Sequence, residues 1–107
     1  MIKNAKSVGR LELLSWINNL CECDYPRVET CCDGIGYAQV LDAMAPSQPF
    51  PLHKLNFNAK SKEERIANLK LFQAHLKKLR LPFVPDCTSI ANGRFQNNIE
   101  VIMFLYD

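Results

Sequence analysis

No apolar run in this 107-residue sequence approaches the roughly 20 residues that a membrane-spanning helix needs. The first ten residues also contain no hydrophobic block of the kind found in a secretory signal peptide. Internal repeats, low-complexity tracts and sustained strand-like alternation of apolar and polar residues are missing as well. We therefore expect a soluble, cytoplasmic protein with no membrane partner.

The common motifs of catalysis and nucleotide binding are also missing. No P-loop, H-E-x-x-H or G-x-S-x-G pattern occurs, and no cysteine has a histidine near it in the sequence. The segment Gly34-Ile35-Gly36-Tyr37 lacks the third glycine of a dinucleotide-binding loop, and no predicted strand precedes it. Small residues that let helices approach closely explain this segment better. We expect no enzyme activity and no cofactor.

The five cysteines are an odd number that cannot pair fully, and a reducing cytosol keeps thiols free. The alternative is a metal site built from four of them: Cys21, Cys23, Cys31 and Cys32. Zinc ligands usually stand two to four residues apart, whereas these are spaced as C-x-C and C-C. We therefore expect neither a disulfide nor a bound metal. His53 and His75 are expected at the surface or on the flank of a helix.

The overall composition is that of a globular protein, with 48% hydrophobic and 22% charged residues. A chain of this length fits one domain, so we assign residues 1–107 to a single domain with a folded core over about 10–106. The net charge of +2 conceals an uneven distribution, because residues 43–80 carry eight bases against two acids, or +6. Such a basic segment suits an acidic partner, although a solvated charged surface is the simpler alternative.

The first part of the chain predicts one long helix and one short one. Apolar residues step by three and four, which predicts a helix over about 8–21. Ser7 is its expected N-cap, and Trp16 is expected to be a core anchor. Pro26 is suited to open a short helix that runs to Cys31.

The next segment predicts a third helix followed by a rigid loop. Asp33 is expected to cap this helix, and four residues share its apolar face: Ile35, Ala38, Leu41 and Met44. Pro46 ends the helix. Three prolines make 46–51 an extended loop, because each fixes φ and removes a backbone donor.

The clearest predicted element is a helix over 62–80. Ser61 and Glu64 have the spacing of a capping box, and Pro82 disfavours helix at the residue before it. One face is apolar and the opposite face is polar or basic, with Lys70, Gln73, Lys77 and Arg80. A turn around 86–92 and a last helix over about 94–106 follow.

These elements predict an all-α domain of four main helices plus one or two short ones. The helix over 62–80 is expected to be central to the fold. The predicted core of the domain consists of eight residues: Trp16, Ile17, Leu41, Leu69, Phe72, Leu76, Ile99 and Ile102.

Five segments of the sequence have the pattern of a known family. They are Leu13-Leu14-Ser15-Trp16-Ile17-Asn18, Cys32-Asp33-Gly34-Ile35-Gly36-Tyr37-Ala38-Gln39, Phe57-Asn58-Ala59-Lys60, 66–79, and Gly93-Arg94-Phe95-Gln96-Asn97-Asn98-Ile99-Glu100. In this order they resemble L-x-W-I-N, C-S-G-A-A-Y-C-Q, F-Q-A-K, I-Q-N-F-K-I-L-Q-A-G-F-K-R and G-K-F-Q-D-N-F-E of the end-binding family of microtubule plus-end proteins. Each is weak alone, but five in register from about Arg10 to Phe104 are specific.

The resemblance implies a calponin-homology domain that binds the microtubule lattice between tubulin subunits, prefers growing plus ends and regulates microtubule dynamics. It implies a location on the cytoskeleton, at plus ends and the spindle, and a role in cell division. By position, the residues that fall where this family contacts microtubules are Lys54, Lys60, Arg94 and Gln96, with Arg10 as a weaker candidate.

Three departures from the family pattern predict weaker binding. The family often has two lysines where this chain has His53-Lys54. A family lysine falls at Phe83, where Arg80 is a partial replacement, and Phe104 stands where the family has tryptophan.

The alternative is a calponin-homology module that scaffolds other proteins or binds actin without microtubule affinity. A nucleic-acid partner is not expected, because a net charge of +2 is small for binding a polyanion. The linker and coiled coil of the family are absent from this sequence. The isolated domain is expected to be a monomer, and a longer protein containing it is expected to dimerise through such a coiled coil.

Overall fold

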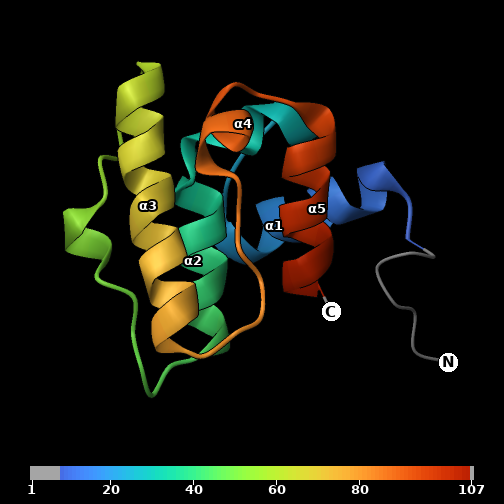
Figure 1. Ribbon diagram of the computed structural model, residues 1–107. Coiled ribbons are helices and arrows are strands. Elements are labelled where there is room, and N and C mark those ends of the chain that lie inside the picture. Colours follow the sequence, from blue (N-terminus) through green and yellow to red (C-terminus); the bar gives the residue numbers. More distant parts are fainter. Residues whose placement is uncertain (1–7, 107) are drawn as a thin grey trace, which may run out of the picture.

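The computed structural model describes residues 8–106, which form helices and connecting loops with no strand among them. The four long helices are α1 (Arg10–Cys21), α2 (Ile35–Met44), α3 (Lys62–Lys78) and α5 (Phe95–Tyr106). The short ones are α4 (Cys87–Ala91) and the 3-10 helices η2 (Val28–Asp33) and η3 (Leu52–Lys54). The prediction of an all-α fold with four main helices is therefore confirmed (Figure 1).

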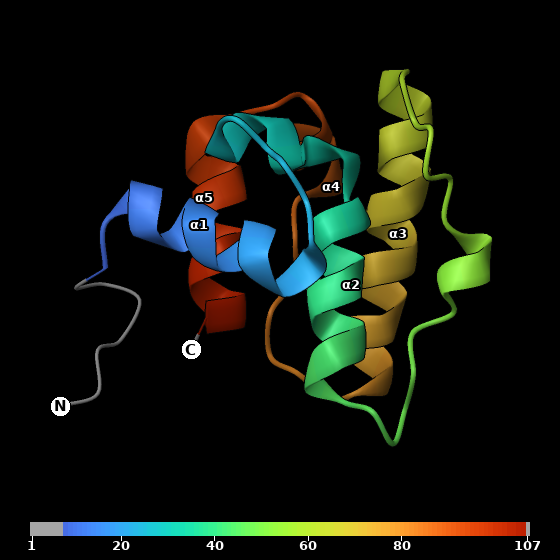
Figure 2. The same ribbon diagram turned by 180° about the vertical axis from the view of Figure 1, so that it is seen from behind.

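Three of the long helices, α2, α3 and α5, run in the same direction, and α1 lies across them (Figures 1 and 2). Helix α2 lies between its neighbours and contacts α1, α3 and α5. Helix α1 also contacts α5, so the first and last helices of the fold are neighbours. No helix among residues 8–106 combines the length and the apolar character that a membrane crossing requires.

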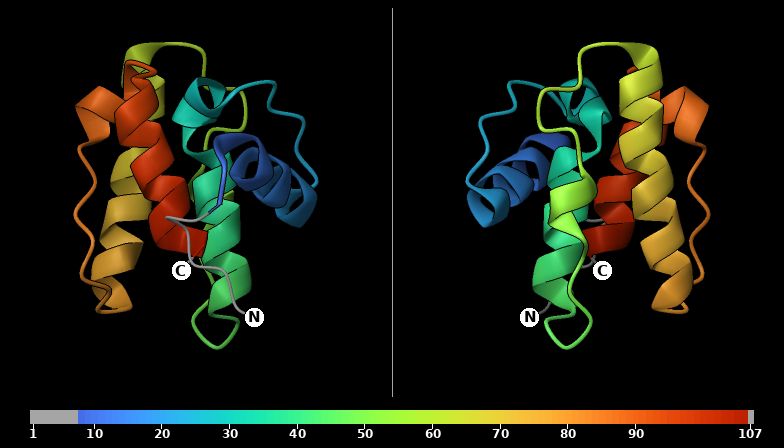
Figure 3. Two further views of the ribbon diagram at one scale, coloured as in Figure 1. Left: turned by 90° about the vertical axis from the view of Figure 1, so that its right-hand side faces the viewer. Right: turned by 90° about the vertical axis from the view of Figure 1, so that its left-hand side faces the viewer.

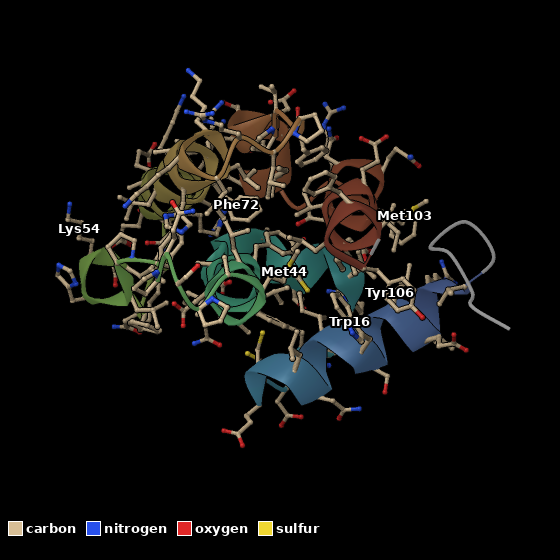
Figure 4. All side chains as sticks on the ribbon, turned by 90° about the horizontal axis from the view of Figure 1, so that it is seen from below. Trp16, Met44, Lys54, Phe72, Met103 and Tyr106 are labelled. Carbon is tan, nitrogen blue, oxygen red and sulfur yellow. The ribbon has the colours of Figure 1, made fainter. Side chains whose placement is uncertain are left out.

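Seven of the eight predicted core residues are buried: Ile17, Leu41, Leu69, Phe72, Leu76, Ile99 and Ile102. Trp16 differs, because it is only partly buried and covers the edge of the core rather than filling it. Its ring meets that of Tyr106 edge-on, with 5.2 Å between centroids (Figure 4). Tyr37 is fully buried in the centre instead, with its ring 5.9 Å from that of Phe72.

The predicted helix starts need correction. Helix α1 begins at Arg10 with Gly9 as its N-cap, and the predicted cap Ser7 lies outside the described residues. The short second helix is a 3-10 helix that starts at Val28 rather than Pro26.

Asp33 acts at the start of α2, but from one position before the N-cap. The cap is Gly34, whose φ of +78° favours glycine, and Asp33 Oδ1 accepts a hydrogen bond from the Ile35 N–H at 2.9 Å. The same oxygen accepts from the Tyr25 hydroxyl at 2.7 Å. A Cβ added at Gly36 would lie 2.9 Å from the Tyr25 ring, so close packing accounts for the second glycine of this segment.

Two side chains differ in burial from the prediction. Met44 is 47% exposed rather than part of the apolar face of α2, because it is the last residue of that helix. His75 is buried rather than at the surface. Its Nε2 lies 3.0 Å from the Gln48 carbonyl oxygen and its ring 4.9 Å from the ring of Phe50, so the proline-rich loop covers it.

The predicted capping box at the start of α3 is confirmed. The Glu64 N–H donates to Ser61 Oγ at 3.1 Å, and the Ser61 N–H donates to Glu64 Oε1 at 2.9 Å. The Lys60 N–H donates to the same carboxylate oxygen at 3.0 Å. These donors, the Ser61 N–H foremost, lower the pKa of Glu64 from 4.5 to about 2.

This pKa shift predicts a pH dependence of stability. Because the folded pKa lies below the unfolded value of 4.5, the stabilisation by ionised Glu64 is complete above that pH. It is lost as the pH falls toward about 2.

Glu64→Gln is expected to be less stable than the wild type at pH 7 and to approach it in acid. Urea unfolding at several pH values measures both. Glu63→Gln, at the exposed neighbouring position, is the control, and a Glu64→Gln difference that stays constant with pH would contradict the prediction.

Candidate functional site

The predicted binding residues Lys60 and Arg94 come from loops at the same end of the molecule. Both side chains are exposed, Lys60 just before α3 and Arg94 just before α5. The two helices begin at the same end of the fold, as Figure 3 shows from both sides. The direction of the helices therefore places both cations at one end.

One side chain, Arg65 on the first turns of α3, ties these two loops together. Its Nε donates to the Ala91 carbonyl oxygen at 3.0 Å, and its Nη1 donates to the Lys60 carbonyl oxygen at 2.9 Å. The planar guanidinium bridges the loop before α3 and the end of α4. The sequence prediction missed this role, because Arg65 is simply one of the eight bases in its segment.

A second side chain that the sequence prediction missed, Asn68, fixes the start of the loop between η3 and α3, which carries Lys60. It is 1% exposed. Its Oδ1 accepts from the Asn56 N–H at 2.9 Å, and its Nδ2 donates to the carbonyl oxygens of Asn56 and Asp33 at 2.9 and 3.0 Å. The sequence signal that could have indicated its burial is spacing, since Asn68 stands one helical turn before the core residue Phe72 and so lies on the same face of the helix.

The backbone of Arg94 is held by the buried side chain of Asn98. The Asn98 Nδ2 donates to the Arg94 carbonyl oxygen at 2.8 Å, and its Oδ1 accepts from the Tyr37 hydroxyl at 2.6 Å. Gly93, with a φ of +76°, makes the turn between α4 and α5. Arg94 also helps to lower the pKa of Asp86, although the larger cause is the hydrogen bond from the Ser89 N–H. Arg94 thus projects into solvent from a fixed backbone.

Gln96 lies on the first turn of α5, and Arg10, the first residue of α1, lies beside that turn. The Arg10 guanidinium carbon is 5.8 Å from the centroid of the Phe95 ring, which brings the start of α1 beside the start of α5. Gln96 is exposed, and its Nε2 donates to Glu100 Oε1 at 3.0 Å along the same helix. The structure thus places Arg10 beside Phe95, the residue between Arg94 and Gln96 in the chain.

Lys54 stands apart from this group. It lies on η3, on the outer side of α3, and projects away from the body of the molecule (Figure 4). With Leu71, His75 and Lys78 of α3 it lines a hollow of about 190 Å³. The candidate site therefore has a main surface formed by Lys60, Arg94, Gln96 and Arg10, and a separate cation at Lys54.

The cysteines have the environment of structural thiols rather than of a reactive site. All five are free, and burial raises the pKa of each thiol, that of Cys21 to about 12. The Cys21 Sγ donates to the Gly36 carbonyl oxygen at 3.3 Å. Within 8–106, no group of three or more His, Cys, Asp or Glu side chains is arranged to hold a metal ion. The surface formed by Lys60, Arg94, Gln96 and Arg10 is therefore a better candidate site than the cysteines.

Comparison with known proteins identifies a domain family and similar relatives. Residues 8–107 match the profile described as "Calponin homology (CH) domain". "Microtubule-associated protein RP/EB family member 1C" of Arabidopsis thaliana is 34% identical over 105 residues, which is 98% of this chain and 32% of that protein. Member 1B of the same organism is 35% identical over 105 residues, 98% of this chain and 36% of that protein. The chain thus spans about a third of the length of these relatives.

A solved structure has the same fold. A chain from the structure described as "Structural Basis of Microtubule Plus End Tracking by XMAP215, CLIP-170 and EB1" superposes with a TM-score of 0.82. It is 28% identical in sequence, and the superposition covers 91% of this chain and 81% of that chain.

Proposed function

Because the chain belongs to the calponin homology (CH) domain family, a family of binding domains, we propose that it binds microtubules through the surface formed by Lys60, Arg94, Gln96 and Arg10. The observation that carries the proposal is the bridge made by Arg65, which holds the Lys60 loop against the end of α4, just before Arg94. The microtubule-associated relatives, similar along 98% of this chain, support the choice of partner.

Electrostatics supports a partner for these cations. Arg94 stands at the start of α5, where a positive charge gains nothing from the helix dipole. Tubulin is acidic, so exposed bases on this surface have complementary charge. Lys54 adds a further cation on the outer side of α3. Each exposed ionic contact is worth about 0.2–1 kcal/mol, so several are needed to set an affinity.

The proposal extends to preference for growing plus ends, to control of microtubule dynamics, and to a place on the cytoskeleton during cell division. It assigns no catalysis, membrane partner or nucleic-acid partner. Under this proposal the isolated domain is a monomer. His53, Phe83 and Phe104 are the positions at which this chain departs from the family pattern. Two of them, Phe83 and Phe104, stack with 4.7 Å between ring centroids. Affinity below that of the relatives is expected.

The double variant Lys60→Glu with Arg94→Glu tests the proposed surface. We expect its apparent affinity for microtubules to fall at least about fivefold, since two attractive contacts become repulsive. The thermal midpoint is expected to stay nearly unchanged, because both side chains are exposed. Cosedimentation with stabilised microtubules at several salt concentrations measures the effect, and wild-type binding is expected to weaken steadily with salt.

Lys70→Glu with Lys77→Glu is the matched control, since it makes the same change of charge on exposed positions further along α3. Equal losses in the two double variants would mean that total charge, and not the proposed surface, sets the affinity. Actin filaments are pelleted in parallel. A wild-type domain that pellets with actin but not with microtubules would favour the actin-binding alternative.

A further inference from the structure

A groove opens between the first turn of α1, residues 26–29 and the start of α5, and Arg10 is the one lining residue that it shares with the proposed microtubule surface. Its volume is about 250 Å³. Leu14 and Val28 are buried and line it, together with the partly buried Phe95. Leu11 also lines it and is 76% exposed, so it adds to the apolar surface that a ligand can reach.

Charged side chains surround this apolar lining. Arg10 and Arg27 line the groove and are exposed, and Glu29 is the acid among the lining residues. The Arg10 guanidinium lies over the Phe95 ring at 5.8 Å, so its charge is held at the edge of the apolar surface. Two guanidinium groups against one carboxylate give the groove a net positive charge, which favours an acidic ligand.

The size of the groove indicates the kind of ligand. Sites for cofactors and drug-sized molecules usually have about 300–1,000 Å³, so this groove is small for them. It is suited to one large side chain inserted from a protein surface. Arginine next to apolar or aromatic residues is also the composition typical of protein interface centres.

We propose that this groove binds a short acidic peptide segment of a partner protein that inserts one large apolar side chain. The inserted side chain packs against Leu14, Val28 and Phe95. Carboxylates on either side of it meet Arg10 and Arg27, whose planar forks match carboxylate oxygens in pairs. The inference goes beyond the proposed function. The two share Arg10, but the inference does not depend on microtubule binding, because Arg27 and the apolar lining are not among the proposed microtubule contacts.

Fluorescent heptapeptides with one central leucine, phenylalanine or tryptophan between glutamates provide the probe. Fluorescence anisotropy at low salt is expected to give a Kd below about 1 mM for at least one of them. The same peptides with a central alanine, or with lysines in place of the glutamates, are expected to bind at least tenfold more weakly. No binding below that limit, or equal binding of the alanine peptide, would overturn the proposal.

Variants of the domain then locate the binding. Arg27→Ala and Leu11→Ser are both at exposed positions, and each is expected to weaken peptide binding at least about fivefold. Lys70→Ala removes an exposed charge outside the groove and is expected to have no effect. Unchanged binding by Arg27→Ala would overturn the proposal. Microtubule pelleting is measured separately, so failure of peptide binding counts against the groove alone and leaves the proposed function standing.

Discussion

Replacing Asn68 with alanine is expected to lower the free energy of unfolding by about 2–4 kcal/mol. The substitution removes three hydrogen bonds, from the Asn56 N–H and to the carbonyl oxygens of Asn56 and Asp33. Each buried backbone group left without a partner costs about 1–3 kcal/mol, and water recovers part of this cost at the exposed Asn56. Urea unfolding followed by circular dichroism measures the change.

Asn92→Ala is the matched control, because that asparagine is exposed and lies outside the core. It is expected to change stability by less than about 0.5 kcal/mol. If the proposed surface binds microtubules, Asn68→Ala also weakens that binding, although Asn68 is buried, because it fixes the loop that leads to Lys60. A variant as stable as the wild type would mean that the loop is held by its other contacts.

Leu76→Ala is expected to cost about 2–5 kcal/mol through the cavity that it leaves. Leu76 is 1% exposed and lies on the face of α3 that carries Phe72 and Leu69, both fully buried. The spread reflects how far the surrounding helices can relax into the space. Thermal and urea unfolding measure the loss. Leu20→Ala removes the same atoms from a side chain that is 44% exposed, and an equal effect there would contradict the cavity explanation.

The fold class could be predicted because local signals and apolar periodicity agreed along most of the chain. The start of α3 is the clearest example, since the spacing of Ser61 and Glu64 specifies reciprocal hydrogen bonds within four residues. The resemblance to end-binding proteins, which rested on five segments in order, is confirmed by the comparisons.

The errors fall where distant parts of the chain decide the environment. His75 is buried because Phe50 and Gln48, far away in the sequence, cover it. Trp16 has the periodicity of a core residue, but it packs against Tyr106 at the edge of the core and is only partly buried. Periodicity gives the face of a helix on which a residue lies, and not how deeply its neighbours bury that face.

For the candidate site, sequence position could name Lys60 and Arg94 but not explain why they share one end of the molecule. The common direction of α3 and α5 places them there, and contacts made by Arg65 with Ala91, 26 residues away, and by Asn98 with Arg94 and Tyr37 hold the two loops in place. Such polar contacts have no periodicity, because a single side chain of the right length is sufficient. The groove beside Phe95 could not be predicted for the same reason, as three separate segments line it.

The bond between Tyr37 and Asn98 has a consequence for how the protein is made. The two residues are 61 positions apart, so α2 leaves the ribosome well before the helix that completes its core. At the usual rates of about 5–20 residues per second, this interval lasts roughly 3–12 seconds. Helix α1, which also contacts α5, emerges earlier still and waits longer for that contact. The nascent chain is therefore expected to need protection from aggregation until α5 has emerged, and a slower rate of translation between α2 and α5 would lengthen that exposure.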